Sequence, residues 1–260
     1  MHNATTPPAT GVSSLIPAVH NSRKNAEIMG QLLLWDIDGT LIRGGGVGAA
    51  AIADAAATAA GRPVNGHAVM MHGKTDPQIL TEIFRAAEVA EDAIPGLLPS
   101  AMAEAERLLA QAEADLRAKG EVLPGVLDAL ARFHLMPGVR QSLVTGNLLG
   151  NAAVKLAAFE LTHYFDVEVG AYGTDHADRG ELVPIALERV ARLRGERYRR
   201  HDVWVIGDTP ADFACAQAAG VRCILVATGL IPRAELATCG ADAVFDDLTE
   251  TEAVVRTLTG

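Results

Sequence analysis

The sequence has few cysteines and no long apolar run, and each shortage excludes a class of protein. Three of its 260 residues are cysteines, Cys215, Cys223 and Cys239. Their number is odd and their spacing does not match a metal-binding cluster, so we interpret them as reduced core residues of a cytoplasmic protein. The longest apolar runs, such as residues 49–60, are too short or too interrupted to cross a bilayer. We therefore predict no transmembrane helix.

Basic residues are also scarce, which bears on the partners that the protein can bind. Lys and Arg number 22 against 32 Asp and Glu, and no stripe of basic residues is evident. This balance argues against a nucleic acid or an anionic membrane as the main partner, although a small anion can still bind locally. The hydrophobic content of 49% is enough for one large domain or for a core with an insert. The sequence indicates no oligomeric state.

Residues 1–29 differ in composition from the rest of the chain. They are rich in Ser, Thr, Asn, Pro and Ala, and their one apolar run, residues 15–19, is broken by Pro17 and too short for a signal peptide. We interpret this segment as a disordered tail. A second interpretation is that Met29 is the natural start and that residues 1–28 are upstream sequence.

From residue 31 onward, short apolar runs alternate with helical patterns, which indicates βα units and a parallel sheet. Strands are predicted at residues 32–35, 139–144, 166–169, 203–206, 222–226 and 243–245. Helices are predicted after most of them, at residues 149–159, 181–193, 210–219, 232–237 and 249–258. Each strand is apolar on both faces, as strands buried in a parallel sheet tend to be.

Between residues 46 and 120 the pattern changes to Ala-rich amphipathic helices, and no strand is evident. Three helices are predicted, at residues 47–60, 77–90 and 101–119. Asp76 is the expected N-cap of the second helix, with Pro77 at its first position, and Ser100 is the expected N-cap of the third. We call this segment the helical insert.

Flexible linkers flank the helical insert. They are the glycines at 44–46 and the region 120–124, and their flexibility suggests a hinged lid over the core. The predicted domains are thus an α/β core of residues 30–45 and 121–260 and a helical insert of residues 46–120.

Polar residues follow three of the predicted strands at the point where each strand ends. They lie in residues 36–40, with two carboxylates one residue apart, in residues 145–147 and in residues 207–212. Because ligands of an open α/β sheet bind beyond the carboxyl ends of its strands, we expect these side chains to converge. Clustered carboxylates repel one another unless a cation lies among them, and a hard divalent ion such as Mg²⁺ suits oxygen ligands.

A bound metal ion makes a phosphate ester a suitable substrate, because the charges complement each other. One carboxylate can then attack phosphorus, while the second protonates the leaving oxygen and later activates water against the aspartyl-phosphate. A glycine beside the second carboxylate, Gly39, lets the backbone approach the phosphoryl group.

The ordered motifs resemble those of the haloacid dehalogenase superfamily. Asp-Ile-Asp-Gly-Thr-Leu at 36–41, Thr145 after an apolar strand, and Gly-Asp-Thr-Pro-Ala-Asp at 207–212 are similar to its first, second and fourth motifs. The resemblance covers residues 31–260. It implies a doubly wound, mainly parallel α/β core. The helical insert resembles the family's helical cap, as in phosphoglycolate phosphatases and β-phosphoglucomutases.

The resemblance also implies a role for each motif residue. Asp36 would be the nucleophile and a metal ligand, and Asp38 the acid–base group whose backbone carbonyl also binds Mg²⁺. Thr145 would bind the phosphate, with Gly146 and Asn147 beside it. The remaining implied roles are those of a metal ligand for Asp208 and of a support behind the ligands for Asp212.

The third motif departs from the family pattern, which supplies a Lys, less often an Arg, to balance charge at the phosphate. We favour Arg179 as the catalytic cation because it lies in a loop just before a helix. Lys155 is the competitor, but it lies inside an amphipathic helix and is interpreted as a surface cation. Lys74 and Thr75 of the helical insert could contact substrate, with helix capping by Thr75 or Asp76 as the alternative.

These features together predict a Mg²⁺-dependent phosphatase that acts on small phosphorylated metabolites, with 2-phosphoglycolate as the best guess. The alternatives are a phosphomutase of the β-phosphoglucomutase type and a non-catalytic, ligand-binding module of the same fold. Dehalogenase and phosphonate-cleaving branches are disfavoured, because they generally lack an acid at the position of Asp38.

Overall fold

The protein is described by a computed structural model, which covers residues 1–2 and 30–259. The interpretations of residues 3–29 as a tail or as upstream sequence therefore lie outside the described residues. In the part of the chain that the structure describes, no helix is both long and apolar enough to cross a membrane.

A six-stranded sheet forms the centre of the protein, and all of its strand pairs are parallel. In spatial order its strands are β5 (Ala171–Tyr172), β4 (Val139–Thr145), β1 (Gln31–Trp35), β6 (Val203–Gly207), β7 (Arg222–Val226) and β8 (Ala243–Phe245). Strand β1 lies inside the sheet, and its residues 32–35 are completely buried. Its apolar side chains therefore fix the position of the loop that follows.

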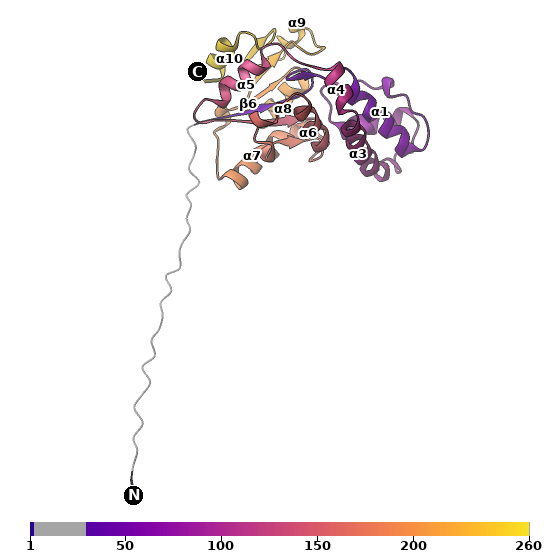
Figure 1. The fold of residues 1–260 in the computed structure, drawn as a ribbon, viewed down its shortest axis with the longest axis horizontal. Helices are drawn as coiled ribbons and strands as arrows, with labels where there is room; N and C mark the ends of the chain where they lie inside the picture. Colours follow the sequence, from indigo (N-terminus) through magenta and orange to yellow (C-terminus); the bar gives the residue numbers. More distant parts are fainter. Residues whose placement is uncertain (3–29, 260) are drawn as a thin grey trace.

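Helices cover both faces of this sheet (Figure 1). On one face lie α5 (Val126–His134), α6 (Leu149–Ala158) and α10 (Thr251–Thr259). On the other lie α7 (Leu182–Arg194), α8 (Pro210–Ala219) and α9 (Arg233–Leu236). Successive side chains of a strand point to opposite faces, so alternate residues of β1 pack against the two helical layers. The fold is therefore the predicted doubly wound, mainly parallel α/β core.

Four helices lie between two short antiparallel strands, β2 (Ile42–Arg43) and β3 (Glu121–Val122). They are α1 (Val47–Ala60), α2 (Asp76–Ala86), α3 (Ile94–Gln111) and α4 (Glu113–Lys119). Figure 1 shows α1, α3 and α4 gathered on one side of the sheet. Helices α1, α2 and α3 form an apolar cluster of their own, which includes Ile52, Leu80 and Phe84, and Leu148 just before α6 joins it. The helical insert thus packs against the core at α6.

Short 3₁₀ helices connect several of these elements. They are η1 (Gly66–Ala68), η2 (Thr162–Tyr164), η3 (Val167–Val169), η4 (Arg179–Glu181) and η5 (Arg200–Asp202). The predicted strand at 166–169 is wrong, because this stretch forms η3 and the edge strand β5 begins only at Ala171. The carboxylate of Asp166 binds Arg140 and Arg194 there, which favours a compact turn over an extended strand.

Two helix starts in the insert also differ from the prediction. Ser100 is not an N-cap, because α3 begins at Ile94 with Pro95 in its first turn and runs through Pro99 and Ser100. Helix α2 has Thr75 as its N-cap instead of Asp76: the Thr75 hydroxyl accepts the Gln78 N–H, and the Gln78 side chain accepts the Thr75 N–H. Asp76 is thereby free for contacts with the core.

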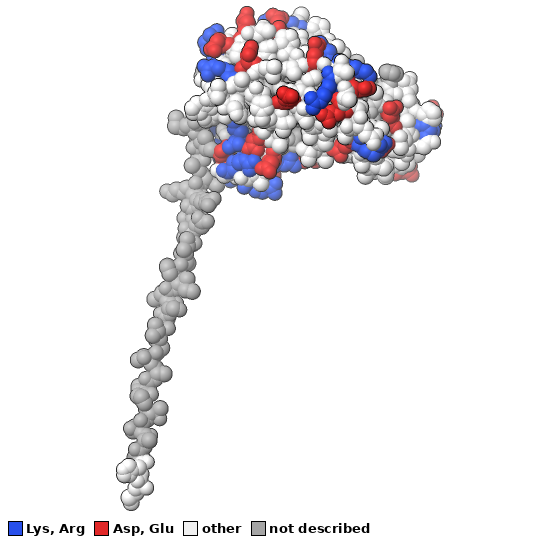
Figure 2. Space-filling view, in the orientation of Figure 1, with Lys and Arg blue, Asp and Glu red and all other residues white. Residues whose placement is uncertain are grey.

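Charged side chains on the face drawn in Figure 2 carry both signs, with Lys and Arg beside Asp and Glu. Ion pairs join many charged side chains in the described part of the chain, for example those of Arg194 with Asp166 and Glu168. This arrangement agrees with the absence of a basic stripe in the sequence.

The return from the helical insert to the core is tightly packed at Gly125, where φ is +76° and an added Cβ would lie 2.0 Å from the Leu248 carbonyl carbon. We expect Gly125→Ala to lower the free energy of unfolding by more than about 2 kcal/mol, because a left-handed alanine and a backbone overlap are both unfavourable. Gly195→Ala is the matched control, with φ at +71° and no atom within 4 Å of the added Cβ. Chemical denaturation measures both, and equal midpoints would contradict the packing.

Candidate active site

The loop after β1 presents the two carboxylates of the first motif to different surroundings. The Asp36 N–H still donates to Ile206 O at 2.9 Å, so this residue continues the sheet, and it is only 5% exposed. The side chain of Asp38 is 47% exposed. Gly39 directly follows Asp38. Its φ is +82°, and a Cβ on it would lie 2.3 Å from Asp208 Oδ2. Only glycine permits this approach of the loop to the Asp208 carboxylate.

The two acids of the fourth motif, Asp208 and Asp212, have different surroundings: Asp212 is fully hydrogen-bonded, and Asp208 lines the cavity. Thr209 is the N-cap of α8 and forms a capping box with Asp212, whose Oδ2 accepts the Thr209 N–H at 3.0 Å and the Thr209 hydroxyl at 2.7 Å. Asp212 is completely buried, and its other oxygen accepts a hydrogen bond from Arg179. Among the described residues, the single hydrogen bond that the Asp208 side chain accepts is a long one, at 3.2 Å, from the Thr40 hydroxyl. The oxygens of the Asp208 carboxylate are therefore available to coordinate a cation.

Three carboxylates, those of Asp36, Asp208 and Asp212, bring one oxygen each within 4.8 Å of the others. Burial raises the pKa of Asp36 to about 6, and burial together with the charges of Asp212 and Asp36 raises the pKa of Asp208 to about 9. Burial is the largest cause of both shifts, and the charge of Arg179 offsets only part of them. Asp36 and Asp208 could hold a divalent cation, because the oxygens of Asp212 already have partners.

Arg179, the cation that the sequence analysis favoured, lies beside Asp36. Arg179 begins η4 just before α7, and the residue is only 6% exposed, with its guanidinium among buried carboxylates. Its Nη2 is 3.1 Å from Asp36 Oδ2 and also pairs with Asp212. The charges of Asp212 and Asp36 raise the pKa of Arg179 despite its burial, so it stays cationic. The guanidinium thus lies beside the candidate nucleophile.

Lys155 is also in the site, and its interpretation as a surface cation is wrong. This lysine of α6 is 6% exposed, and its Nζ is 2.6 Å from both Asp38 Oδ2 and Asn147 Oδ1. The partial enclosure of Asp38 in the cavity acts to raise its pKa, but the Lys155 charge and the hydrogen bonds from Lys155 and Asn147 outweigh this effect and lower that pKa. The two candidate cations therefore pair with different carboxylates. Arg179 pairs with Asp36, and Lys155 pairs with Asp38.

The second motif connects these groups. Thr145 is completely buried at the end of β4, and its hydroxyl oxygen accepts a hydrogen bond from Asn147 Nδ2 at 2.8 Å. The same amide nitrogen donates to Asp38 Oδ2 at 2.7 Å. Gly146 has no room for a side chain, because a Cβ there would lie 2.3 Å from Lys74 O. The motif thus touches both the acid–base candidate and the helical insert.

The segment before α2 lies across these loops. Lys74 lines the cavity and pairs with Glu82, whereas the buried Thr75 hydroxyl donates to Ala177 O at 2.7 Å and caps α2. The next residue, Asp76, donates its N–H to Gly146 O at 2.8 Å.

Sequence reasoning did not find the roles of Asp76 and Asn151. Asp76 Oδ2 accepts the Leu148 N–H at 2.8 Å and Asn151 Nδ2 at 2.9 Å, and burial raises the pKa of this carboxyl. Asn151 lies one helical turn before Lys155, so both face the same side of α6. The spacing of four residues could have shown from the sequence that Asn151 and Lys155 share one face of α6. It could not have shown which residues pack against that face.

A cavity of about 460 Å³ lies between the core and the helical insert. The core contributes Asp36, Asp38, Thr145, Asn147, Lys155, Arg179 and Asp208 to its wall. The insert contributes the start of α1 around Gly48 and apolar side chains that include Ile52, Met71 and Ile79. Its position at the carboxyl ends of the strands is the expected place for ligands of such a sheet.

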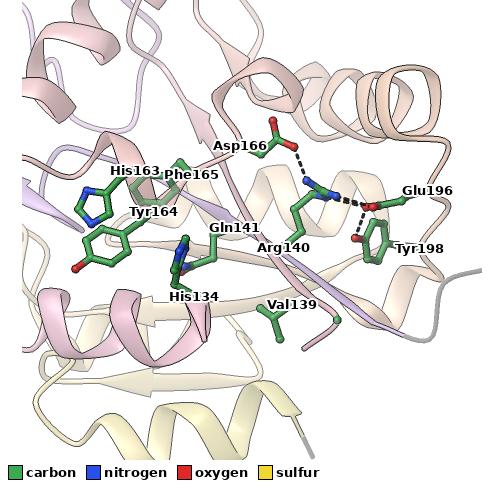
Figure 3. A pocket seen from close by; sticks show the side chains of 11 residues that line it. His134, Val139, Arg140, Gln141, His163, Tyr164, Phe165, Asp166, Glu196 and Tyr198 are labelled. Atoms are coloured by element: carbon green, nitrogen blue, oxygen red, sulfur yellow. Dashed lines mark hydrogen bonds and ion pairs between the residues drawn. The ribbon is translucent and has the colours of Figure 1, made fainter. Parts of the chain in front are cut away.

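A second cavity, also of about 460 Å³, opens at the other end of β4 (Figure 3). Its charged groups bind one another: Arg140 lies between Asp166 and Glu196, and the Tyr198 hydroxyl donates to Glu196 at 2.7 Å. Because ligands of an open parallel sheet bind at the carboxyl ends of its strands, the cavity beside Asp36 is the candidate active site.

Comparison with known proteins shows the family of this chain. Residues 31–220 match the model of the haloacid dehalogenase-like hydrolase family. The chain is 28% identical over 221 residues to phosphoglycolate phosphatase 1 of Pseudomonas aeruginosa, covering 85% of this chain and 78% of the relative.

Solved structures share the fold. A predicted phosphatase from Clostridium acetobutylicum has a TM-score of 0.65 at 17% identity, over 89% of this chain and 100% of that one. A predicted phosphoglycolate phosphatase from Haemophilus somnus has a TM-score of 0.61 at 19% identity, over 87% and 98% of the two chains. The family match covers most of the chain and all of the motifs described above, and we conclude that this protein belongs to the haloacid dehalogenase-like hydrolases.

Proposed function

We propose that this hydrolase is a Mg²⁺-dependent phosphatase that cleaves small phosphomonoesters through an aspartyl-phosphate at Asp36. The observation that carries the proposal is the separation of the two carboxylates of the first motif. Asp36 is buried against Arg179, whereas Asp38 is half exposed and held by Lys155 and Asn147. Two acids in such different surroundings suit two roles, those of nucleophile and of acid–base group.

The donor set fits a hard divalent cation. The carboxylates of Asp36 and Asp208 would hold Mg²⁺, together with the backbone carbonyl of Asp38, and Asp212 would hold Arg179 behind them. The ion would neutralise charge on the carboxylates and on the phosphoryl oxygens.

The reaction would proceed in two displacements at phosphorus. Asp36 Oδ attacks phosphorus, the bond from phosphorus to the ester oxygen breaks, and Asp38 gives a proton to the departing alcohol. The negative charge of the bound phosphate would favour the protonated form of Asp38, against the lowering of its pKa by Lys155. Asp38 then takes a proton from water, whose oxygen attacks the same phosphorus and releases inorganic phosphate and free Asp36. Arg179 and the Thr145 hydroxyl would stabilise the equatorial oxygens in both steps.

The relative from Pseudomonas aeruginosa supports 2-phosphoglycolate as the first substrate to test. We further propose that residues 46–120 act as a cap domain on a core of residues 30–45 and 121–260, because the insert forms one wall of the cavity. The three cysteines are free thiols, which agrees with a cytoplasmic enzyme.

Replacement of the nucleophile tests the mechanism directly. We expect Asp36→Asn to lower kcat for p-nitrophenyl phosphate by more than about 10³-fold, because losing one stabiliser of developing charge already costs about 10² to 10³. Initial rates with saturating MgCl₂ measure this, and circular dichroism checks the fold. Substantial turnover by the folded variant would refute the covalent mechanism.

Metal binding should depend on pH through Asp208. Its pKa in the folded protein, about 9, lies above the ordinary value of 3.8, so the metal-free fold keeps a proton that the unfolded chain has released. The stability of the metal-free protein therefore falls as pH rises between these values, and Mg²⁺ replaces the proton. We expect MgCl₂ to raise Tm more at about pH 8 than at about pH 6.

Thermal unfolding with and without MgCl₂ measures this difference at each pH. Asp208→Asn should lose the shift, whereas Asp54→Asn, on the exposed side of α1, should keep it. An equal shift at both pH values in the wild type would count against Asp208 as a ligand.

A screen of phosphorylated metabolites tests the substrate. We expect 2-phosphoglycolate to have the highest kcat/KM and to release inorganic phosphate without any bisphosphate, because water accepts the phosphoryl group. Isomerisation of a sugar phosphate that requires a bisphosphate would instead identify a phosphomutase. Complete inactivity toward all esters with Mg²⁺ present would identify a ligand-binding module.

A further inference from the structure

Helix α6 connects the active site to every helix of the insert. Asp76 of α2 accepts the Leu148 N–H, and Glu106 of α3 accepts the Gly150 N–H at 2.7 Å. Arg117 of α4 donates to Ala157 O at 3.2 Å near the other end of the helix. The fourth helix of the insert, α1, contacts α6 at Lys155.

Gly48 in the first turn of α1 lies directly against the end of the Lys155 side chain. A Cβ on Gly48 would be 3.3 Å from both Cε and Nζ of Lys155, which is closer than ordinary van der Waals contact. The absence of a side chain on Gly48 therefore lets Nζ stay within 2.6 Å of Asp38 Oδ2 and Asn147 Oδ1. Helix α1 covers the lysine and holds it against the core.

The ammonium group of Lys155 is already occupied by contacts with two core residues, Asp38 and Asn147. Its two short hydrogen bonds join Asp38 to the Asn147 amide, and the same amide donates to Asp38 and to the Thr145 hydroxyl oxygen. The cation beside Asp36 is Arg179, at 3.1 Å. The two cations thus have separate places, one at the candidate nucleophile and one at the candidate acid–base group.

We propose that Lys155 is a positioning residue: with Gly48 of the helical insert against it, its ammonium holds Oδ2 of Asp38, which leaves the other oxygen of this carboxyl group to carry the proton for the leaving oxygen. The inference rests on the proposed phosphatase function and adds to it a link between the docking of the insert and the acid–base group.

The first test compares two leaving groups in Lys155→Met, which keeps the aliphatic stem and removes the ammonium. An alkyl phosphate such as 2-phosphoglycolate needs a proton on its leaving oxygen far more than p-nitrophenyl phosphate does. We expect kcat/KM for the alkyl ester to fall about 10- to 100-fold, the range for loss of a charged hydrogen bond, and that for the aryl ester to fall less than about threefold.

Other outcomes of this comparison overturn the proposal. Equal losses on both esters, with a lower Tm, mean that Lys155 only supports the fold. A loss confined to KM, with kcat unchanged, means that Lys155 binds substrate.

The second test asks whether Gly48 acts through Lys155. Gly48→Val should reproduce the selective loss on the alkyl ester, because its side chain would displace Nζ from Asp38. The same substitution should cause no further loss in the Lys155→Met background, because the displaced group is gone. Ala50→Val is the matched control, since Ala50 is exposed on α1 and does not line the cavity. Additive losses in the double variant would overturn the coupling.

The two proposals fail in different ways. A folded Asp36→Asn variant that keeps its activity refutes the phosphatase mechanism itself. A wild-type enzyme that needs Asp36, combined with a non-selective effect of Lys155→Met or additive losses, refutes the role of Lys155 and leaves the mechanism standing.

Discussion

Repulsion between carboxylates at one edge of the sheet is the constraint on which the rest of the site depends. Asp36, Asp208 and Asp212 are all buried within reach of a single ion, and the fold tolerates them because compensating groups surround them. Arg179 lies between two of them, and the capping box of α8 satisfies Asp212. Asp208 is the least compensated of the three, because it accepts one long hydrogen bond from Thr40, and burial and the neighbouring carboxylates raise its pKa.

The same constraint explains why α6 is more than a layer of the core. Its buried lysine balances the fourth carboxylate, Asp38, and its amino end receives the carboxylate of Asp76 from the helical insert. Charges from the core and from the insert therefore meet on one helix. The insert and the acid–base candidate are thus connected through α6, which contacts Asp76 at its amino end and carries Lys155 against Gly48. This connection gives the insert a physical means to influence the proposed chemistry beyond closing the cavity.

Much of this arrangement could be predicted from the sequence, because an acid directly after an apolar strand has a defined place in a parallel sheet. That reasoning placed Asp36 and Asp208 beside each other correctly. It failed for Lys155, because helical periodicity shows which residues share a face but not what packs against that face. It also failed at residues 166–169 and at Ser100, where composition alone does not distinguish a strand from a 3₁₀ turn, or a helix start from a proline tolerated within a helix.

The central claim is that Asp36 carries the phosphoryl group during turnover. Acid quenching of the enzyme while it hydrolyses a phosphate ester, followed by borohydride reduction and peptide sequencing by mass spectrometry, tests this claim most directly. The account predicts that position 36, and no other acidic position, is reduced to homoserine, because borohydride reduces an acyl phosphate but not a free carboxylate. Reduction at Asp38 or Asp208, or no reduction in an enzyme that is turning over, would contradict it.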